Sequence, residues 1–265
     1  MCDPFNMELV PLTRLLQGKR VVLASSSPRR RDILSSMGLQ FEVVPSHFQE
    51  SLEKVRFLAP PEYARETAKL KALEVASGLC RAPPTSLTPP SALQDLHPPD
   101  VIIGADTIVA VDGVILEKPK DKDDAYRMLR RLSGQQHSVI TGVAILRPLW
   151  RRQLQEPSST CPEAPEAEGD PEAEVELSLF HEETRVTFSR LSEPLLCEYV
   201  ESGEPLDKAG AYGLQARGGA LAERVEGDFF NAVGFPLNRC IRELAAIFPD
   251  VGPQVPVSQR PATPQ

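Results

Sequence analysis

The chain has 265 residues, carries a formal net charge of −8 and is 41% hydrophobic. This length allows one large or two small domains with a real core, and the acidic balance argues against a protein that binds nucleic acid polymers, because such proteins need lysine and arginine to neutralise phosphates. The scattered cysteines form no CxxC pair, and no run approaches the ~20 apolar residues of a membrane span. The first residues show no basic segment followed by an apolar one, so we expect no signal peptide and a cytoplasmic protein with free thiols.

The first predicted elements are a strand, a helix and a second strand. Residues 19–24 (KRVVLA) predict a short buried strand, and Ser27 followed by Pro28 predicts the N-terminus of a helix. This helix should end near Gly38, and residues 41–44 should form the next strand. Such a strand–helix–strand opening favours the α/β class.

Further along the chain, helical and strand patterns alternate. The predicted elements are helices at residues 61–79, 123–132, 193–202 and 235–248, and strands at residues 101–111, 114–116, 138–146 and 175–189. The dipeptide Asp112-Gly113 is a hairpin signal between two of these strands.

Two biased stretches interrupt this series. Residues 81–100 are rich in proline and residues 151–174 are acidic and contain proline, so we predict that both are inserted surface loops. We therefore expect an N-terminal extension at residues 1–18, one globular domain at residues 19–248 and a disordered tail at residues 249–265.

Residues 24–31 read ASSSPRRR and place arginines at the start of a helix. Cations are disfavoured there because the helix dipole already carries positive charge at that end. A bound anion would remove the conflict, since free amides and hydroxyls cradle phosphate and arginine binds it with two nitrogens. An ordinary capped surface helix is the alternative. The candidate anion-binding residues are Ser25, Ser27, Arg29 and Arg30.

Three charged residues further along could carry chemistry. Asp106 interrupts an apolar strand and needs a partner, which could be a cation, a metal or a substrate proton, and Gly104 beside it permits close backbone approach. Lys118 follows the hairpin strand and could share a rim with Asp106. Lys71 lies on the apolar stripe of its predicted helix. The alternatives are a structural ion pair, a routine charged turn and a lysine that extends to solvent.

A glycine-containing stretch, EPLDKAGAYGLQ at residues 204–215, predicts a tight loop that presents polar groups around Tyr212. An unremarkable glycine loop explains it equally well. The chain has no GxxxxGK[ST] sequence and no GxSxG sequence, which argues against a P-loop enzyme and a serine hydrolase. Its histidines have no metal-binding spacing.

The motifs SSSPRR, GADT, LEKP, LSG, EPLDKAGAYGLQ and NAVGFP occur in an order that resembles the Maf family of nucleoside triphosphate pyrophosphatases. The resemblance covers roughly residues 20–248, apart from the two inserted loops. It implies a mixed α/β fold with an elongated sheet flanked by helices, and a central cleft between two lobes. Within the family, the chain is most similar to the Maf-like half of a vertebrate protein whose other half resembles a methyltransferase.

The resemblance also implies an activity and its chemistry. Maf enzymes hydrolyse a nucleoside triphosphate between the α and β phosphates, with Mg²⁺ or Mn²⁺ as the divalent cation, and a homodimer is expected. By motif, Asp106 would be the base that activates water, and Arg29, Lys71 and Lys118 would hold the triphosphate. Glu50 would bind the metal together with Asp106. No membrane and no nucleic acid polymer is expected as a partner.

Base selection is implied as well. Arg29, Thr107 and Gln215 match positions tied to a preference for dTTP and UTP, with modified pyrimidine nucleotides as further candidate substrates. One alternative is a Maf hydrolase with another base preference, such as for 7-methyl-GTP. The other is a non-catalytic nucleotide-binding regulatory protein, against which the intact charged positions argue.

Overall fold

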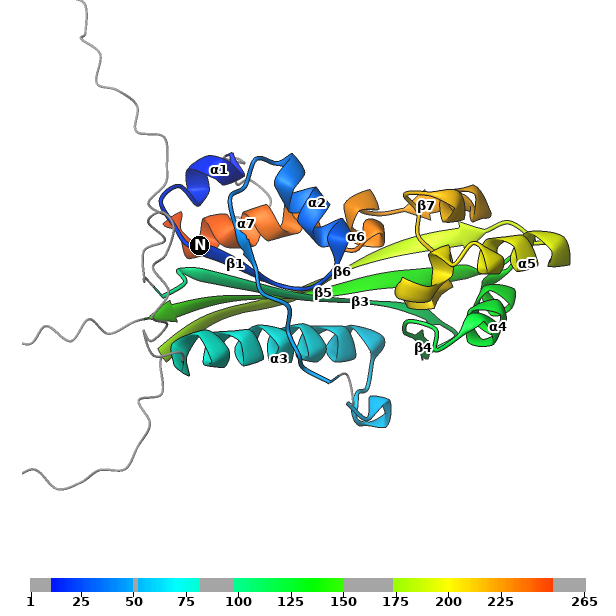
Figure 1. Ribbon diagram of the computed structural model, residues 1–265, viewed down its shortest axis with the longest axis horizontal. Helices are drawn as coiled ribbons and strands as arrows, with labels where there is room; N and C mark the ends of the chain where they lie inside the picture. Colours follow the sequence, from blue (N-terminus) through cyan, green and yellow to red (C-terminus); the bar gives the residue numbers. More distant parts are fainter. Residues whose placement is uncertain (1–10, 50–51, 82–97, 150–173, 250–265) are drawn as a thin grey trace, which may run out of the picture.

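The computed structural model describes residues 11–49, 52–81, 98–149 and 174–249, and Figure 1 shows an elongated sheet with helices on both faces. The sheet has seven strands in the order β2-β1-β3-β5-β6-β7, and β4 pairs with β3 beside this path. Strand β1 runs parallel to β2 and β3, whereas the other pairs are antiparallel. The predicted mixed α/β fold is confirmed.

Most predicted elements are present within a few residues of their expected bounds. The strands are β1 (Val21–Ala24), β2 (Glu42–Val43), β3 (Val101–Val111), β4 (Val114–Leu116), β5 (Gln136–Leu149), β6 (Glu174–Phe188) and β7 (Ala222–Glu226). The α-helices are α1 (Leu12–Leu15), α2 (Pro28–Ser36), α3 (Pro60–Arg81), α4 (Lys122–Leu132), α5 (Glu193–Glu201), α6 (Phe229–Val233) and α7 (Leu237–Ile247). Short 3₁₀ turns are η1 (Lys54–Arg56), η2 (Glu204–Asp207), η3 (Ala209–Ala211) and η4 (Arg217–Leu221).

The predictions for the chain ends and insertions have different outcomes. Within the predicted N-terminal extension, α1 places Leu12 and Leu15 in the core. The predicted loops at residues 81–100 and 151–174 and the predicted tail at residues 249–265 lie almost entirely outside the described residues.

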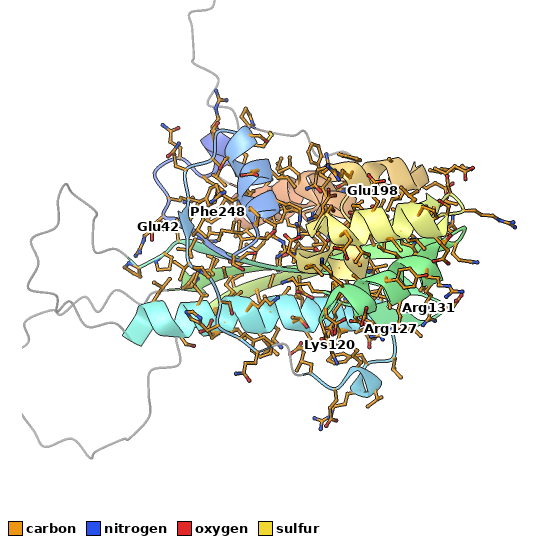
Figure 2. The ribbon with its side chains drawn as sticks, turned by 45° about the vertical axis from the view of Figure 1, so that its right-hand side comes forward. Glu42, Lys120, Arg127, Arg131, Glu198 and Phe248 are labelled. Atoms are coloured by element: carbon orange, nitrogen blue, oxygen red, sulfur yellow. The ribbon has the colours of Figure 1, made fainter. Side chains whose placement is uncertain are left out.

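Alternation along β3 divides the core between the two faces of the sheet, because successive side chains of a strand point to opposite sides. Val101 and Ile103 pack with α1, α2 and α7, and Val109 and Val111 pack on the same face with α4 and α5. The outer face of α4 carries Arg127, Arg131 and other charged side chains (Figure 2). The two lobes of the fold are thus two cores on one face of the same long strand.

Helix α3 covers the opposite face and approaches the sheet unusually closely. A Cβ atom added to Gly104 would lie 2.4 Å from the carbonyl oxygen of Ala68, and one added to Gly142 would lie 2.3 Å from that of Ala64. Alanine on the helix and glycine on the strands therefore let the two backbones meet. The close approach that Gly104 permits is to this helix.

One edge of β3 is left open in the middle of the sheet. Strand β1 pairs with residues 101–104 of β3, and β4 pairs with residues 109–111. Strand β5 occupies the other edge along residues 102–110. Residues 105–108 therefore lie between β1 and β4 with no strand paired to that edge, and a cavity forms where β1 ends.

Candidate active site

The cavity has a volume of about 240 Å³ and lies between the two cores, beside the open edge of β3. Five cationic side chains and two carboxylates are among the described residues that line it: Arg29, Arg30, Lys71, Lys118, Lys208, Asp106 and Asp207. Ser25, Ser27, Thr107 and Gln215 also line it. Apart from Glu50, which lies outside the described residues, every candidate site residue is thus brought to one cavity.

Arg30 fastens three walls of this cavity together. Its buried guanidinium donates from Nη1 to Ser25 Oγ, from Nη2 to Thr107 Oγ1 and from Nε to the carbonyl oxygen of Gly234, each at 2.9 Å. These acceptors belong to the β1–α2 turn, β3 and the turn after α6. The geometry makes Arg30 a residue that positions the walls.

The neighbouring Arg29 faces a carboxylate of this chain. Its Nη1 donates to Asp207 Oδ2 at 3.0 Å, and its Nη2 donates to the carbonyl oxygen of Asp207 at 3.3 Å. The conflict between arginine and the helix dipole is therefore relieved at Arg29 by an acid from the opposite lobe. The anion that the sequence motif requires is supplied, in this structure, by the protein itself.

Lys71 and Asp106 form a largely buried ion pair on the wall of the cavity. Lys71 Nζ donates to Asp106 Oδ1 at 2.7 Å, and the two side chains are 12% and 9% exposed. The pair exists because α3 lies so close to β3 at Gly104. Lys71, rather than Lys118, is therefore the cation that contacts Asp106.

Lys118 and Gln215 lie at the exposed rim of the cavity. Within the described chain, the ammonium of Lys118 has no hydrogen-bond or ion-pair partner, so it can reach a ligand. Its neighbour Glu117 accepts a hydrogen bond from the hydroxyl of Tyr63 at 2.5 Å and forms an ion pair with Lys54. This fixes the backbone from which Lys118 projects.

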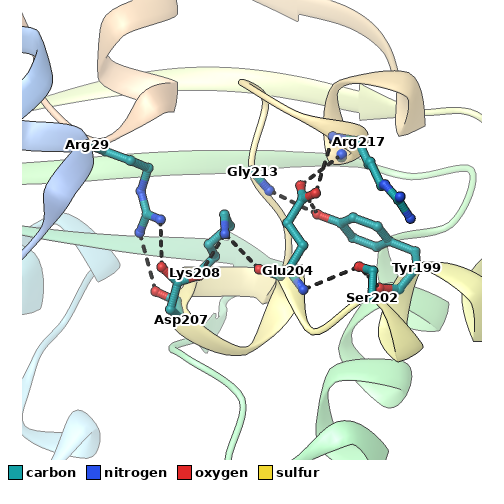
Figure 3. A network of polar contacts seen from close by, with 9 residues as sticks. Arg29, Tyr199, Ser202, Glu204, Asp207, Lys208, Gly213 and Arg217 are labelled. Carbon is teal, nitrogen blue, oxygen red and sulfur yellow. Dashed lines mark hydrogen bonds and ion pairs between the residues drawn. The ribbon is translucent and has the colours of Figure 1, made fainter.

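The glycine-containing stretch at residues 204–215, which we call the strap, closes the cavity on the side of the core that packs against α4 and α5, called the second core below. Glu204 holds it in shape, because its carboxylate accepts from the Tyr199 hydroxyl at 3.0 Å and from the backbone N–H of Gly218 at 3.2 Å (Figure 3). Gly210 has φ +67° and lies against Val109, where a Cβ would collide at 2.7 Å. The strap is thus built around glycine and the half-buried carboxylate of Glu204.

Asp207 and Lys208 of the strap were not among the candidate site residues, although the motif that contains them was recognised. Lys208 Nζ donates to Asp207 Oδ1 at 2.6 Å and to the carbonyl oxygen of Glu204 at 2.7 Å. Partial burial by itself would raise the pKa of Asp207, but Lys208 and Arg29 together lower it, so its carboxylate is ionised at neutral pH. The adjacent letters DK were the available signal, yet they look like an ordinary exposed pair.

Behind the strap, His137 on β5 supports the second core. Its Nε2 lies 2.7 Å from the hydroxyl of Tyr212, and its ring meets Phe188 edge-on. Burial lowers the pKa of His137 to about 4. The imidazole is therefore neutral at physiological pH and serves packing.

Comparisons with known proteins agree with these motifs. The family model "Maf-like protein" matches residues 20–247. A human protein named "Probable bifunctional dTTP/UTP pyrophosphatase/methyltransferase protein" is 54% identical over 242 residues, which are 91% of this chain and 34% of that protein. The chain thus spans about a third of the human relative.

Bacterial relatives are similar over almost their whole length. The "dTTP/UTP pyrophosphatase" of a Geobacillus species is 38% identical over 226 residues, covering 85% of this chain and 97% of the relative. The protein of the same name from Moorella thermoacetica is 39% identical over 229 residues, covering 86% and 95%.

Proposed function

The chain belongs to the Maf-like protein family, and we propose that it is a nucleoside triphosphate pyrophosphatase that hydrolyses dTTP and UTP to the monophosphate and pyrophosphate. The observation that carries the proposal is the buried pair of Lys71 and Asp106 in a cavity lined by four further cations. A triphosphate needs that charge, and its hydrolysis needs a positioned carboxylate. The relatives' names supply the substrate class.

The proposed reaction uses the charged groups of the cavity. Asp106 orients a water molecule and accepts one of its protons while the water oxygen forms a bond to the α phosphorus. The bond between that phosphorus and the bridging oxygen breaks, and pyrophosphate leaves with the electron pair. Lys71, Lys118 and Arg29 balance the negative charge that develops on the phosphate oxygens.

A divalent cation is compatible with the residues present. Mg²⁺ is usually bound by one or two carboxylates together with substrate phosphates, and it supplies charge neutralisation of those phosphates. Among the described residues no group of three or more acidic, histidine or cysteine side chains could hold a metal ion. Asp106 is the carboxylate that would contact a Mg²⁺ or Mn²⁺ that arrives with the nucleotide, and the predicted help from Glu50 stays a prediction.

Base selection is proposed to use the rim of the cavity. Uracil and thymine present an acceptor at O4 beside a donor at N3, and the side-chain amide of Gln215 offers the matching donor and acceptor. The hydroxyl of Thr107 already accepts from Arg30 and lies 3.0 Å from that of Thr141, so Thr107 would act by shaping the wall. Cytosine, with an acceptor at N3 and an amino group at C4, presents the opposite pattern, so selection against it requires the Gln215 amide to be held in one orientation.

The test is pyrophosphate release from dTTP, UTP, CTP, ATP and GTP, each with Mg²⁺ or Mn²⁺. We expect release from dTTP and UTP, and a loss of roughly a hundred- to ten-thousandfold in kcat for Asp106→Asn. Wild-type turnover by Asp106→Asn would refute the assigned base. Nucleotide binding without release from any substrate would instead indicate a regulatory protein.

Other expected properties of the enzyme remain outside this test. No helix in the described part of the chain is long and apolar enough to cross a membrane. The homodimer and the cytoplasmic location stay predictions.

A further inference from the structure

The carboxylate of Asp207 lies between two cations of the cavity. Arg29 Nη1 is 3.0 Å from Oδ2, and Lys208 Nζ is 2.6 Å from Oδ1 (Figure 3). All three residues line the cavity. Arg29 comes from the start of α2, whereas Asp207 and Lys208 come from the strap, so one acid joins the two lobes across the cavity.

Lys208 is held in place by contacts other than Asp207. Its side chain is 14% exposed, and its ammonium also donates to the carbonyl oxygen of Glu204. Its aliphatic stem lies over Gly213, where a Cβ atom would be 2.6 Å from Lys208 Cε. Glu204 is in turn fixed by Tyr199. The ammonium would therefore stay at this position if the carboxylate moved away.

Asp207 is the more exposed member of the cluster. Its side chain is 58% exposed, against 21% for that of Arg29. A carboxylate has the same acceptor chemistry as a phosphate, but it carries less charge and fewer oxygens. The two oxygens of Asp207 thus stand where two oxygens of a polyphosphate chain could accept the same hydrogen bonds.

We propose that Arg29 and Lys208 form an anion subsite for the substrate's phosphate chain, and that the carboxylate of Asp207 occupies this subsite until the phosphates displace it. The inference rests on the proposed function and adds Lys208 to its substrate-binding residues. Asp207 lowers the affinity for polyphosphate, and its return to the two cations favours release of pyrophosphate. It acts through Arg29 and Lys208, and so is a positioning residue.

The test uses inorganic pyrophosphate as the probe and the full chain, without divalent cation, in a calorimetric titration. Asp207→Asn keeps the shape of the side chain and removes the competing charge, so we expect pyrophosphate to bind about three- to tenfold more tightly. Lys208→Met keeps the stem over Gly213 and removes the ammonium, so binding should weaken about tenfold. Thermal unfolding would verify that each variant is folded, and Lys208→Arg, which retains the charge, should bind within about threefold of wild type.

Matched controls separate the subsite from a general change in net charge. The control substitutions are Asp112→Asn and Lys122→Gln. Asp112 lies at the hairpin tip with a side chain that is 80% exposed, and Lys122 lies on α4 with a side chain that is 48% exposed. Neither residue lines the cavity, so both variants should bind pyrophosphate as the wild type does.

The outcomes are distinct. If Asp207→Asn binds pyrophosphate no more tightly than Asp112→Asn, the displacement proposal is wrong. If Lys208→Met binds as tightly as Lys122→Gln, Lys208 is not part of the subsite. If Asp207→Asn and Lys208→Met change pyrophosphate affinity as expected but the wild-type protein hydrolyses no nucleotide, the proposed function is refuted and the anion subsite stands. In an active enzyme, Asp207→Asn should lower the KM for dTTP and the inhibition constant of pyrophosphate together, which a merely structural role would not do.

Discussion

Gly104 on β3 faces Ala68 on α3 so closely that a Cβ atom on the glycine would lie 2.4 Å from the alanine's carbonyl oxygen. The same atom would lie 2.8 Å from the Cβ of Ala72, one turn further along the helix. Contacts this short involve backbone and cannot be relieved by rotating a side chain. The distance between helix and sheet at this point therefore depends on glycine.

The first prediction concerns this contact. Gly104→Ala should force α3 away from β3 and cost about 1–3 kcal/mol in the free energy of unfolding, as overpacking of a core does. It should also reduce kcat, because Lys71 belongs to α3 and would move away from Asp106 with the displaced helix. Urea denaturation and steady-state kinetics measure the two effects.

Gly78→Ala is the matched control for this substitution. Gly78 also belongs to α3, but it is exposed and a Cβ there would meet nothing within 4 Å. Alanine should therefore stabilise the helix by roughly 0.5–1 kcal/mol. Equal destabilisation by both substitutions would show that the close contact at Gly104 is not what makes it necessary.

The second prediction concerns the ion pair that the close contact creates. Lys71→Met and Asp106→Asn should each destabilise the fold, because each leaves a largely buried partner with one interaction fewer. The double variant should cost less than the sum of the single ones, with a coupling of roughly 0.5–3 kcal/mol. A double-mutant cycle from urea denaturation measures it. Strict additivity would mean that the two side chains do not stabilise each other.

Most of the charged residues that line the cavity could be predicted from sequence, whereas Asp207, Lys208 and the contacts among the side chains could not. The motifs around Ser25, Asp106 and Lys118 are local and distinctive, so they identified residues that do line one cavity. The partner of Asp106 depends on how α3 crosses the sheet, and a spacing of 35 residues carries no signal for that. The apolar stripe of the predicted helix indicated that Lys71 faces the core. The two glycines that α3 contacts, Gly104 and Gly142, belong to different strands, so nothing in the sequence indicated where the helix crosses the sheet.

The fold shows the same division. Helix α3 was predicted from the regular spacing of its alanines, and β3 was predicted from a long apolar run, which is buried almost throughout. The short elements α1, α6 and β7 were missed, since a few residues carry too little pattern and are held by tertiary contacts. Within β7, three consecutive residues are exposed, which gives no alternation to detect.

The third prediction concerns Arg30. Lysine cannot reproduce the planar guanidinium that reaches Ser25, Thr107 and Gly234 at once. Arg30→Lys should therefore cost about 2–3 kcal/mol in the free energy of unfolding and should lower activity by disturbing the three walls of the cavity. Arg31→Lys, at a side chain that is 59% exposed, should change stability by less than about 0.5 kcal/mol. Similar stability losses in the two variants would contradict the role given to Arg30.

The last prediction concerns the pH dependence of stability and His137. Burial lowers the pKa of this group to about 4 in the folded chain, whereas an unfolded histidine has a pKa of about 6.5. Between these values the unfolded state binds the proton and the folded state does not, so stability is fully present above the unfolded pKa and falls as the pH drops toward 4. The loss attributable to this residue should reach at most about 3 kcal/mol.

The measurement is the free energy of unfolding in urea at pH 7, 6, 5 and 4 for the wild type and for the double variant His137→Leu/Tyr212→Phe. This variant removes both members of the 2.7 Å hydrogen bond and leaves no unpaired hydroxyl in the core. It should lose less stability than the wild type between pH 6 and pH 4, because it lacks the histidine whose protonation favours the unfolded state. Carboxylates elsewhere titrate in both proteins, so their contribution cancels in the comparison. Parallel curves would show that His137 is protonated in the folded chain as readily as in the unfolded one, and that its burial does not exclude the charge.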